Sequence, residues 1–154
     1  MKLFFTAALT SLALATASYA GGPIITSKDT TTAFVGLNWN FNSGGGTPEA
    51  ILGLAHGSRD SSNDVDGGKI SLHFGFLNGF SVEKMKLTGL FGDDSAQGEM
   101  GLGVGFGDGA LFGILGFNTD HVHGGVDVNL GGGLEGYLGI HTIGEFDRVA
   151  LPPA

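Results

Sequence analysis

The sequence of 154 residues contains no cysteine, so disulfide bonds, thiolate nucleophiles and thiolate metal ligands are all excluded. Charge is scarce as well: Asp, Glu, Lys and Arg together make up 14% of the chain, well under the quarter that is usual in soluble domains. Basic residues are the scarcest, with 7 Lys and Arg against 15 Asp and Glu. A chain of net charge −8 lacks the basic footprint that binds phosphate backbones, so nucleic acid is not an expected partner.

The first twenty residues, MKLFFTAALTSLALATASYA, have the three parts of a secretory signal peptide. Lys2 supplies the positive charge, residues 3–15 are mainly apolar, and Ser18 and Ala20 are the small residues of a cleavage site. Residues 21–30 follow as a flexible lead-in to the mature domain. No later segment has the length of apolar sequence that a membrane-spanning helix needs, so a mature chain that enters a membrane must enter it as strands.

From residue 31 onward, large apolar residues alternate with small or polar ones at a period of two, which is typical of half-buried strands. The sequence therefore predicts an all-β domain over 31–146, an antiparallel up-and-down meander of about eight strands. Closure of the last strand onto the first would make a barrel and remove both unpaired edges. Turn-forming residues delimit the expected strands, which are 31–41, 49–57, 69–77, 80–91, 99–106, 110–118, 121–130 and 134–146.

Three connections stand out between these expected strands. Asn78-Gly79 is a pair that favours tight hairpin turns, because both residues tolerate positive φ. The polar run from 58 to 68 is expected to be the longest connection. Residues 147–154 are expected to form a C-terminal tail.

Glycine is abundant, and all 30 glycines come after residue 20. Every second residue from 101 to 109 is glycine, in alternation with Met100, Leu102, Val104 and Phe106. Because an eight-stranded barrel has an interior only just wide enough for side chains, we expect the glycine face inward and the apolar face outward. Polar residues would then line the interior, namely Asn38, Asn40, Lys69, His73, Lys84, Lys86, Glu99, His121, Asp127, Glu135 and His141.

The final segment, GYLGIHTIGEF, is an alternating strand that ends on the aromatic Phe146. With this segment and its eight alternating strands, the chain resembles the small eight-stranded outer-membrane β-barrel proteins of Gram-negative bacteria. The resemblance is one of pattern over nearly the whole mature chain. It implies an outer-membrane location, membrane lipid and the barrel-assembly machinery as partners, and a structural, adhesive or interaction role without enzymatic activity or cofactor. It also implies short turns on the periplasmic side, where the connection 58–68 would be long.

A second interpretation inverts the faces. A soluble periplasmic or secreted β-barrel would bury the large apolar residues in its core, expose the glycines and charges, and bind a small apolar ligand. Alternation alone does not choose between the two.

A candidate metal site begins with His121 and His123, whose imidazoles lie on the same side of the expected strand, about 7 Å apart by strand rise. Asp127 lies on that side too, and such a set suits a metal ion. The His-x-His pair with a later acid resembles the first motif of cupins, whose further Pro-x-Gly and His are missing here. We name these three residues as candidate metal ligands, with a metal-dependent cupin-like enzyme as a third hypothesis and an interior hydrogen-bond network as the alternative.

Two charged groups remain. Asp60, Asp64 and Asp66 resemble part of a calcium loop, but a solvated turn is the better interpretation because the ligand spacing fails at both ends. The charged residues Glu83, Lys84, Lys86 and Glu99 are expected to form an inward salt-bridge network, since unpaired charge inside a barrel would be costly.

Overall fold

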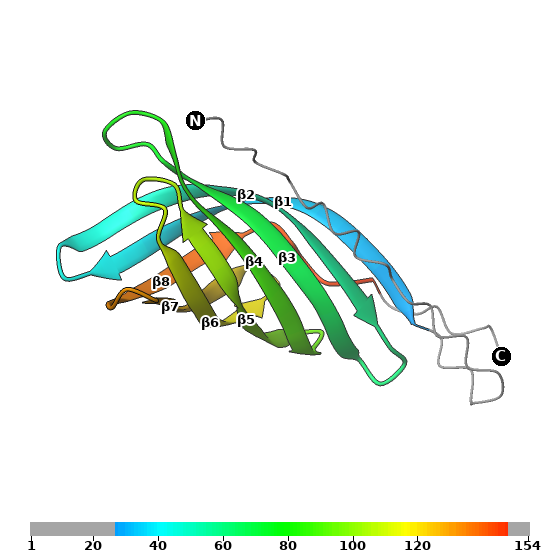
Figure 1. The fold of residues 1–154 in the computed structure, drawn as a ribbon. Coiled ribbons are helices and arrows are strands. Elements are labelled where there is room, and N and C mark those ends of the chain that lie inside the picture. Colours follow the sequence, from blue (N-terminus) through cyan, green and yellow to red (C-terminus); the bar gives the residue numbers. More distant parts are fainter. Residues whose placement is uncertain (1–26, 148–154) are drawn as a thin grey trace, which may run out of the picture.

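The structure, a computed structural model, describes residues 27–147, which form eight antiparallel strands. Each strand pairs with the next along the chain and the last pairs with the first, so the sheet closes into a barrel (Figure 1). This confirms the predicted all-β meander. The strands are β1 (Lys28–Asn42), β2 (Gly45–Arg59), β3 (Asp64–Gly75), β4 (Ser81–Asp93), β5 (Ala96–Gly105), β6 (Leu111–Thr119), β7 (Val122–Asn129) and β8 (Leu134–His141).

The predicted signal peptide, 1–20, lies outside the described residues, as do 21–26 of the lead-in and 148–154 of the tail. The rest of the predicted lead-in is different from expectation, because β1 already begins at Lys28. Across residues 27–147 there is no helix of the length and apolar character that crossing a membrane requires.

The barrel has two unlike ends. We call the end with the turns 43–44, 76–80, 106–110 and 130–133 the hairpin end. The opposite end carries Lys28, His141 and the turns 60–63, 94–95 and 120–121, and we call it the terminus end. Strands β1 to β4 are longer than β5 to β8, and Figure 1 shows them arching beyond the shorter strands.

The polar run 58–68 is mostly strand, so the prediction of a long connection is wrong. Hydrogen-bonded pairing of β2 with β3 reaches Arg59 and Val65, which leaves a turn of residues 60–63 alone. The Asp60 carboxylate closes this turn by accepting the backbone N–H groups of Ser62 and Asp64 at 2.8 and 3.0 Å. Every turn at the terminus end is therefore short.

The turn after β3 also differs from the tight hairpin predicted at Asn78-Gly79. It spans residues 76–80, with Gly79 at a φ of 105°, and Figure 1 shows it projecting from the barrel. Next to it the β3–β4 register shifts, so that His73 pairs with Lys84 but Phe74 pairs with Val82. A bulge at Glu83 therefore explains why residues 80–91 alternate less cleanly than the other segments.

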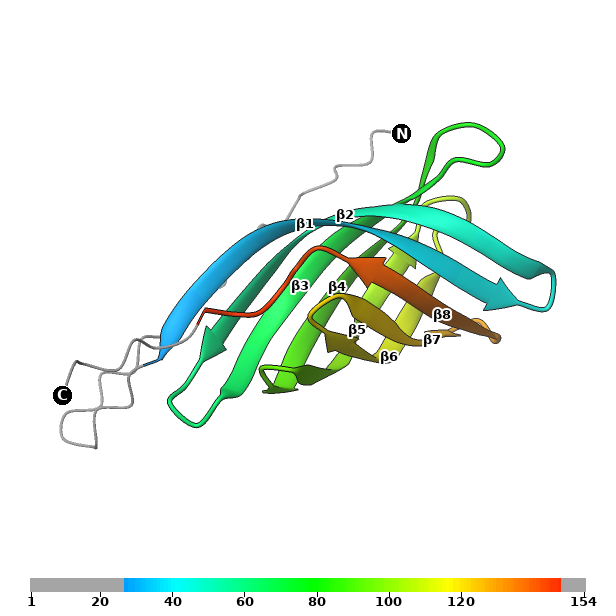
Figure 2. The ribbon, with the colours of Figure 1, turned by 180° about the vertical axis from the view of Figure 1, so that it is seen from behind.

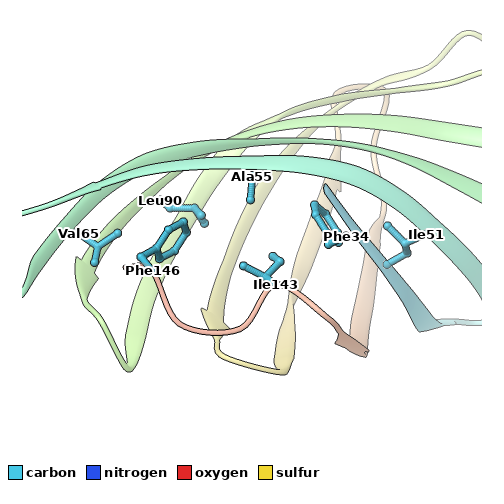
Figure 3. Close-up of a cluster of buried hydrophobic side chains, with 7 residues drawn as sticks. All are labelled: Phe34, Ile51, Ala55, Val65, Leu90, Ile143 and Phe146. Carbon is cyan, nitrogen blue, oxygen red and sulfur yellow. The ribbon is translucent and has the colours of Figure 1, made fainter. Parts of the chain in front are cut away.

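The last predicted strand is too long by five residues. β8 ends at His141, and residues 142–147 then run beside β1, where Thr142 donates its backbone N–H to the Val35 carbonyl at 3.0 Å (Figure 2). Phe146 is only 2% exposed, so it is not the outward aromatic residue of a closing strand. Figure 3 shows that Ile143 and Phe146 point into the barrel toward Ala55 and Leu90.

The glycines Gly101 and Gly103 of β5 face inward, as predicted, and the structure shows what inward glycines make room for. A Cβ on Gly53 would lie 2.5 Å from the Phe34 ring, and a Cβ on Gly57 would lie 2.7 Å from the Phe146 ring. Gly103 in the same way faces the Phe112 ring, and Gly116 and Gly125 face the Tyr137 hydroxyl. Each of these four rings thus contacts an inward glycine, and such small residues leave room for large rings inside a narrow barrel.

Gly101 offers a direct test of this requirement for small inward residues. A Cβ there would overlap the Leu87 carbonyl oxygen and lie 2.6 Å from the Thr88 Cα, both backbone atoms of β4. We expect Gly101→Ala to lower the free energy of unfolding by about 1–3 kcal/mol, because the strands must move apart. The matched control is Gly113→Ala, where a Cβ meets nothing within 4 Å, and this variant should be as stable as the parent or more so. Urea unfolding of both proteins gives the comparison, and equal stability of the two variants would contradict it.

Candidate functional site

The barrel interior is polar along the middle of its axis. Of the residues predicted to line it, all are buried except Glu135, which is half-buried, and His121, which is exposed in the turn before β7. Other buried polar side chains join them, namely Glu49, Arg59, Ser71, Thr88, Gln97, Asn118 and His123. The interior is therefore a candidate site built from all eight strands.

Two buried ion pairs cross this interior. Lys69 Nζ lies 2.9 Å from Glu99 Oε2, and Lys86 Nζ lies 2.7 Å from Asp127 Oδ1. Lys69 and Glu99 come from β3 and β5, and Lys86 and Asp127 from β4 and β7, so each pair spans strands that are not neighbours. The predicted inward network is confirmed for Lys86 and Glu99, and Lys69 joins it as a residue that the network prediction did not include.

Lys84 is the centre of a larger cluster toward the hairpin end. Its ammonium lies 2.6 Å from Glu135, 3.4 Å from Glu49 and 3.6 Å from Asp127. One positive charge thus faces three carboxylates. Glu83 does not belong to the cluster, because it sits in the bulge and is exposed, where it accepts a hydrogen bond from the Ser81 hydroxyl.

Hydrogen bonds to neutral groups extend the network. His73 Nδ1 lies 2.9 Å from Glu49 Oε2, and its other ring nitrogen lies 3.2 Å from the Ser71 hydroxyl. On the neighbouring strand β1 Asn38 donates to Asn40 at 2.8 Å, and His123 Nε2 of β7 lies 3.2 Å from the Asn38 carbonyl oxygen. Each of these buried side chains thereby has at least one hydrogen-bond partner.

Aromatic rings complete the middle of the barrel. Lys86 Nζ lies 3.7 Å from the centroid of the Tyr137 ring and 5.8 Å from that of Phe112, within the range in which a ring face attracts a cation. The His123 ring stacks on His141, with centroids 5.2 Å apart. The remaining hollow at this level has a volume of about 10 Å³, roughly the space of one water molecule. The barrel is therefore closed at its middle.

The terminus end is closed by an apolar stopper, which we define as the contacting buried residues Phe34, Ile51, Ala55, Val65, Leu90, Ile143 and Phe146 (Figure 3). Arg59, which is 2% exposed, holds the Phe146 end of this stopper in place. The guanidinium donates to the Phe146 carbonyl at 3.1 Å, to Asn63 at 2.8 Å and to Asp94 at 2.6 Å. The segment after β8 is thus part of the seal.

The hairpin end is open. A cavity of about 720 Å³ lies between the strand ends there, and we call it the vestibule. Its walls carry the carboxylates of Glu49, Glu83, Asp108, Asp127 and Glu135. The barrel is consequently open at the hairpin end and closed at the terminus end, and charged side chains form the bottom of the vestibule.

The three candidate metal ligands do not form a metal site in the described chain. His121 is exposed, His123 stacks on His141, and Asp127 is paired with Lys86. Within residues 27–147 no group of three or more His, Asp or Glu side chains is arranged to hold a metal ion. Asp60, Asp64 and Asp66 are likewise spread between a turn and a strand.

Arg59, Glu49 and Tyr137 are interior residues that sequence reasoning missed. Glu49 and Arg59 share the parity of the inward glycines Gly53 and Gly57, so extending the β2 alternation at both ends would have found them. Tyr137 shares the parity of Gly139 and His141 in β8. The alternation in β2 and β8 therefore contains the signal for these residues, but the polar composition around Arg59 favours a turn over a strand.

The chain matches no protein-family model, no curated protein and no solved structure. The two faces of the barrel wall are therefore the features from which a function can be inferred.

The buried pair of Lys69 and Glu99 is the best place to test the interior network. Lys69→Met leaves the Glu99 carboxylate buried without a partner ammonium, and we expect a loss of about 3–5 kcal/mol in the free energy of unfolding. The control is Lys28→Met, which breaks a pair with Asp147 whose side chains are 50% and 60% exposed and should cost no more than about 1 kcal/mol. In Lys69→Met/Glu99→Leu most of the loss should be recovered. Full stability of the single Lys69 variant would show that the pair is not needed.

Proposed function

We propose that this chain is an exported outer-membrane β-barrel that crosses the bilayer as a closed vessel, with a structural, adhesive or interaction role and no catalysis. Its partners are membrane lipid and the barrel-assembly machinery that inserts such barrels. The observation that carries the proposal is the composition of the outer wall.

The outer wall is a continuous apolar belt. Large hydrophobic side chains 37% to 69% exposed occur on every strand from β1 to β8, and β5 to β8 present no charged residue outward. Soluble proteins rarely expose apolar patches of more than a few hundred Å², whereas membrane barrels alternate apolar outward and polar inward residues. The belt includes Val35, Leu37, Trp39, Phe41, Leu52, Leu54, Ile70, Leu87, Met100, Leu102, Leu115, Phe117, Val126, Leu138 and Ile140.

Closure of the sheet supports the same proposal. With β8 paired to β1, backbone N–H and C=O groups are bonded around the wall, as the hydrocarbon core of a bilayer requires. Short turns at the terminus end fit the periplasmic side of such barrels, so the proposed orientation has the vestibule on the outer side. Because the apolar stopper and the ion pairs close the interior, the barrel is not proposed as a pore.

The interior does not support the alternative, a soluble barrel that binds a small apolar ligand. Of the hollows found inside the described barrel, the vestibule is lined by carboxylates and the other has room for about one water. A ligand pocket of that kind is usually lined by hydrophobic side chains. The third hypothesis, a cupin-like metal enzyme, has no cluster of ligands in residues 27–147.

Fractionation of cells tests the proposed location. Expressed with its leader in a Gram-negative host, the protein should stay with the outer membrane after an alkaline wash and require detergent for release. Unboiled samples should migrate differently from boiled ones in gels, since the closed barrel resists unfolding. Recovery in the periplasmic extract without detergent would refute the membrane assignment and favour the soluble barrel.

A pair of matched variants tests whether the apolar belt is what allows the barrel to insert into the membrane. Leu102 and Leu77 are similarly exposed, at 63% and 62%, but Leu102 lies in the belt and Leu77 in the turn 76–80. An arginine at the bilayer midplane of a membrane barrel costs about 2–4 kcal/mol, so Leu102→Arg should reduce the amount of folded protein in the membrane. Leu77→Arg should not, and equal yields of both variants would count against the belt.

A further inference from the structure

We propose that Asn78 is a modification site, whose side chain forms a cyclic imide with the backbone of Gly79 and is converted to aspartate and isoaspartate. The only reactants are the chain itself and water, so the reaction needs neither an enzyme nor a cofactor. This inference is independent of the proposed membrane location, because the exposed turn 76–80 has the same chemistry in lipid, in detergent or in water.

The reaction joins two groups that are adjacent in the chain. The backbone nitrogen of Gly79 loses its proton to hydroxide and attacks Cγ of the Asn78 carboxamide, and ammonia leaves as the new C–N bond forms. Water then opens the imide at one of its two carbonyl carbons. Cleavage of the new N–Cγ bond gives aspartate, whereas cleavage of the original peptide bond leaves the chain connected through Cγ as isoaspartate.

The Asn78 carboxamide is free to take part in this reaction. Asn78 is exposed in the turn 76–80, which projects from the barrel (Figure 1), and within residues 27–147 the structure shows no hydrogen bond of its side chain. A carboxamide that is held by hydrogen bonds must first break them before its Cγ can be attacked. The asparagines that are held in this way are Asn38, Asn40, Asn42, Asn63 and Asn118.

The glycine that follows Asn78 is required by the turn and does not obstruct the reaction. Gly79 has a φ of 105°, which L side chains rarely adopt, and a Cβ there would meet nothing within 4 Å. Asn129 is also exposed, but Leu130 follows it with a bulky side chain and donates its N–H to the Leu111 carbonyl at 3.0 Å. The pair that favours a turn is thus also the pair that favours the imide.

Asp-Gly pairs can form the same imide, and the chain contains them at 66–67 and at 108–109. The first pair lies within β3, which is hydrogen-bonded to strands on both sides. In the second pair the Asp108 carboxylate accepts the Ala110 N–H at 2.9 Å. An ionised carboxylate is also a poorer electrophile than a carboxamide, so we expect Asn78 to react first.

Conversion changes the chemical character of this turn. Residues 74–82 contain no charged side chain except Glu83 beyond their end, and Phe76, Leu77 and Phe80 are exposed around Asn78. Both products place a carboxylate among these apolar side chains, and isoaspartate also adds a methylene group to the backbone. Because an ionised carboxylate is costly to bury without a partner, a converted chain presents a more polar turn at the hairpin end.

Peptide mapping of the folded protein in detergent, kept in mildly alkaline buffer and sampled over time, tests the site. Asn78 should convert to a mixture of aspartate and isoaspartate, and isoaspartate is identified by enzymatic methylation of its carboxylate. The conversion should be at least about tenfold faster than that of Asn129, which corresponds to a difference of about 1.4 kcal/mol in activation free energy. The same amount of ammonia should be released.

The control variant is Asn78→Gln, which keeps a carboxamide and the turn glycine but has one more methylene, so the ring that must form is larger. This variant should show no conversion at position 78 and much less isoaspartate in total. Absence of conversion in the parent would overturn the site, as would conversion at Asn129 or Asp108 at an equal rate. Equal isoaspartate in the variant, or aspartate without isoaspartate in the parent, would also overturn it.

Discussion

The small width of an eight-stranded barrel limits which side chains can point into it. Its interior is just wide enough for side chains, so each large inward group needs a small neighbour. The Phe112 ring faces Gly103, and the Tyr137 hydroxyl faces Gly116 and Gly125. The inward glycines are therefore the complement of a few inward rings, and their alternation with large apolar residues leaves those residues on the outside.

The second consequence of the narrow interior is that its charges must pair. Desolvated ions are stable only when geometry compensates for the lost hydration, and here Lys69 meets Glu99 at 2.9 Å and Lys86 meets Asp127 at 2.7 Å. These pairs tie together strands that do not share backbone hydrogen bonds. They close the middle of the barrel, so that the vestibule has a charged floor while the terminus end is filled with apolar side chains. A polar interior of this kind leaves the apolar faces of the strands to the surroundings, which is the basis of the proposed membrane location.

Strand positions and faces could be predicted from the sequence where large apolar residues alternate with small or polar ones without interruption. The fifth strand, with its glycines opposite Met100 and Leu102, was predicted with the right faces because the period of two is unbroken there. The end of β2 was missed, since Ser58 and Arg59 look like turn residues, although Arg59 is buried by its bonds to Phe146, Asn63 and Asp94. Phe146 was predicted as the end of a strand, because nothing local shows that the chain turns inward after His141. The partners of Lys84 could not be predicted from the sequence either. Which side chains meet across a barrel depends on the stagger of its strands and not on their spacing along the chain.

Trp39 can report whether the large apolar side chains face lipid, because it is the only tryptophan of the chain. This residue lies on β1, is 44% exposed, and pairs with Leu138 of β8 across the closure of the barrel. Fluorescence of the protein reconstituted into vesicles with brominated acyl chains is the most direct measurement. If the outer wall faces lipid, the brominated lipid should quench Trp39 strongly and aqueous iodide should quench it little. Quenching by iodide with no effect of the brominated lipid would contradict it.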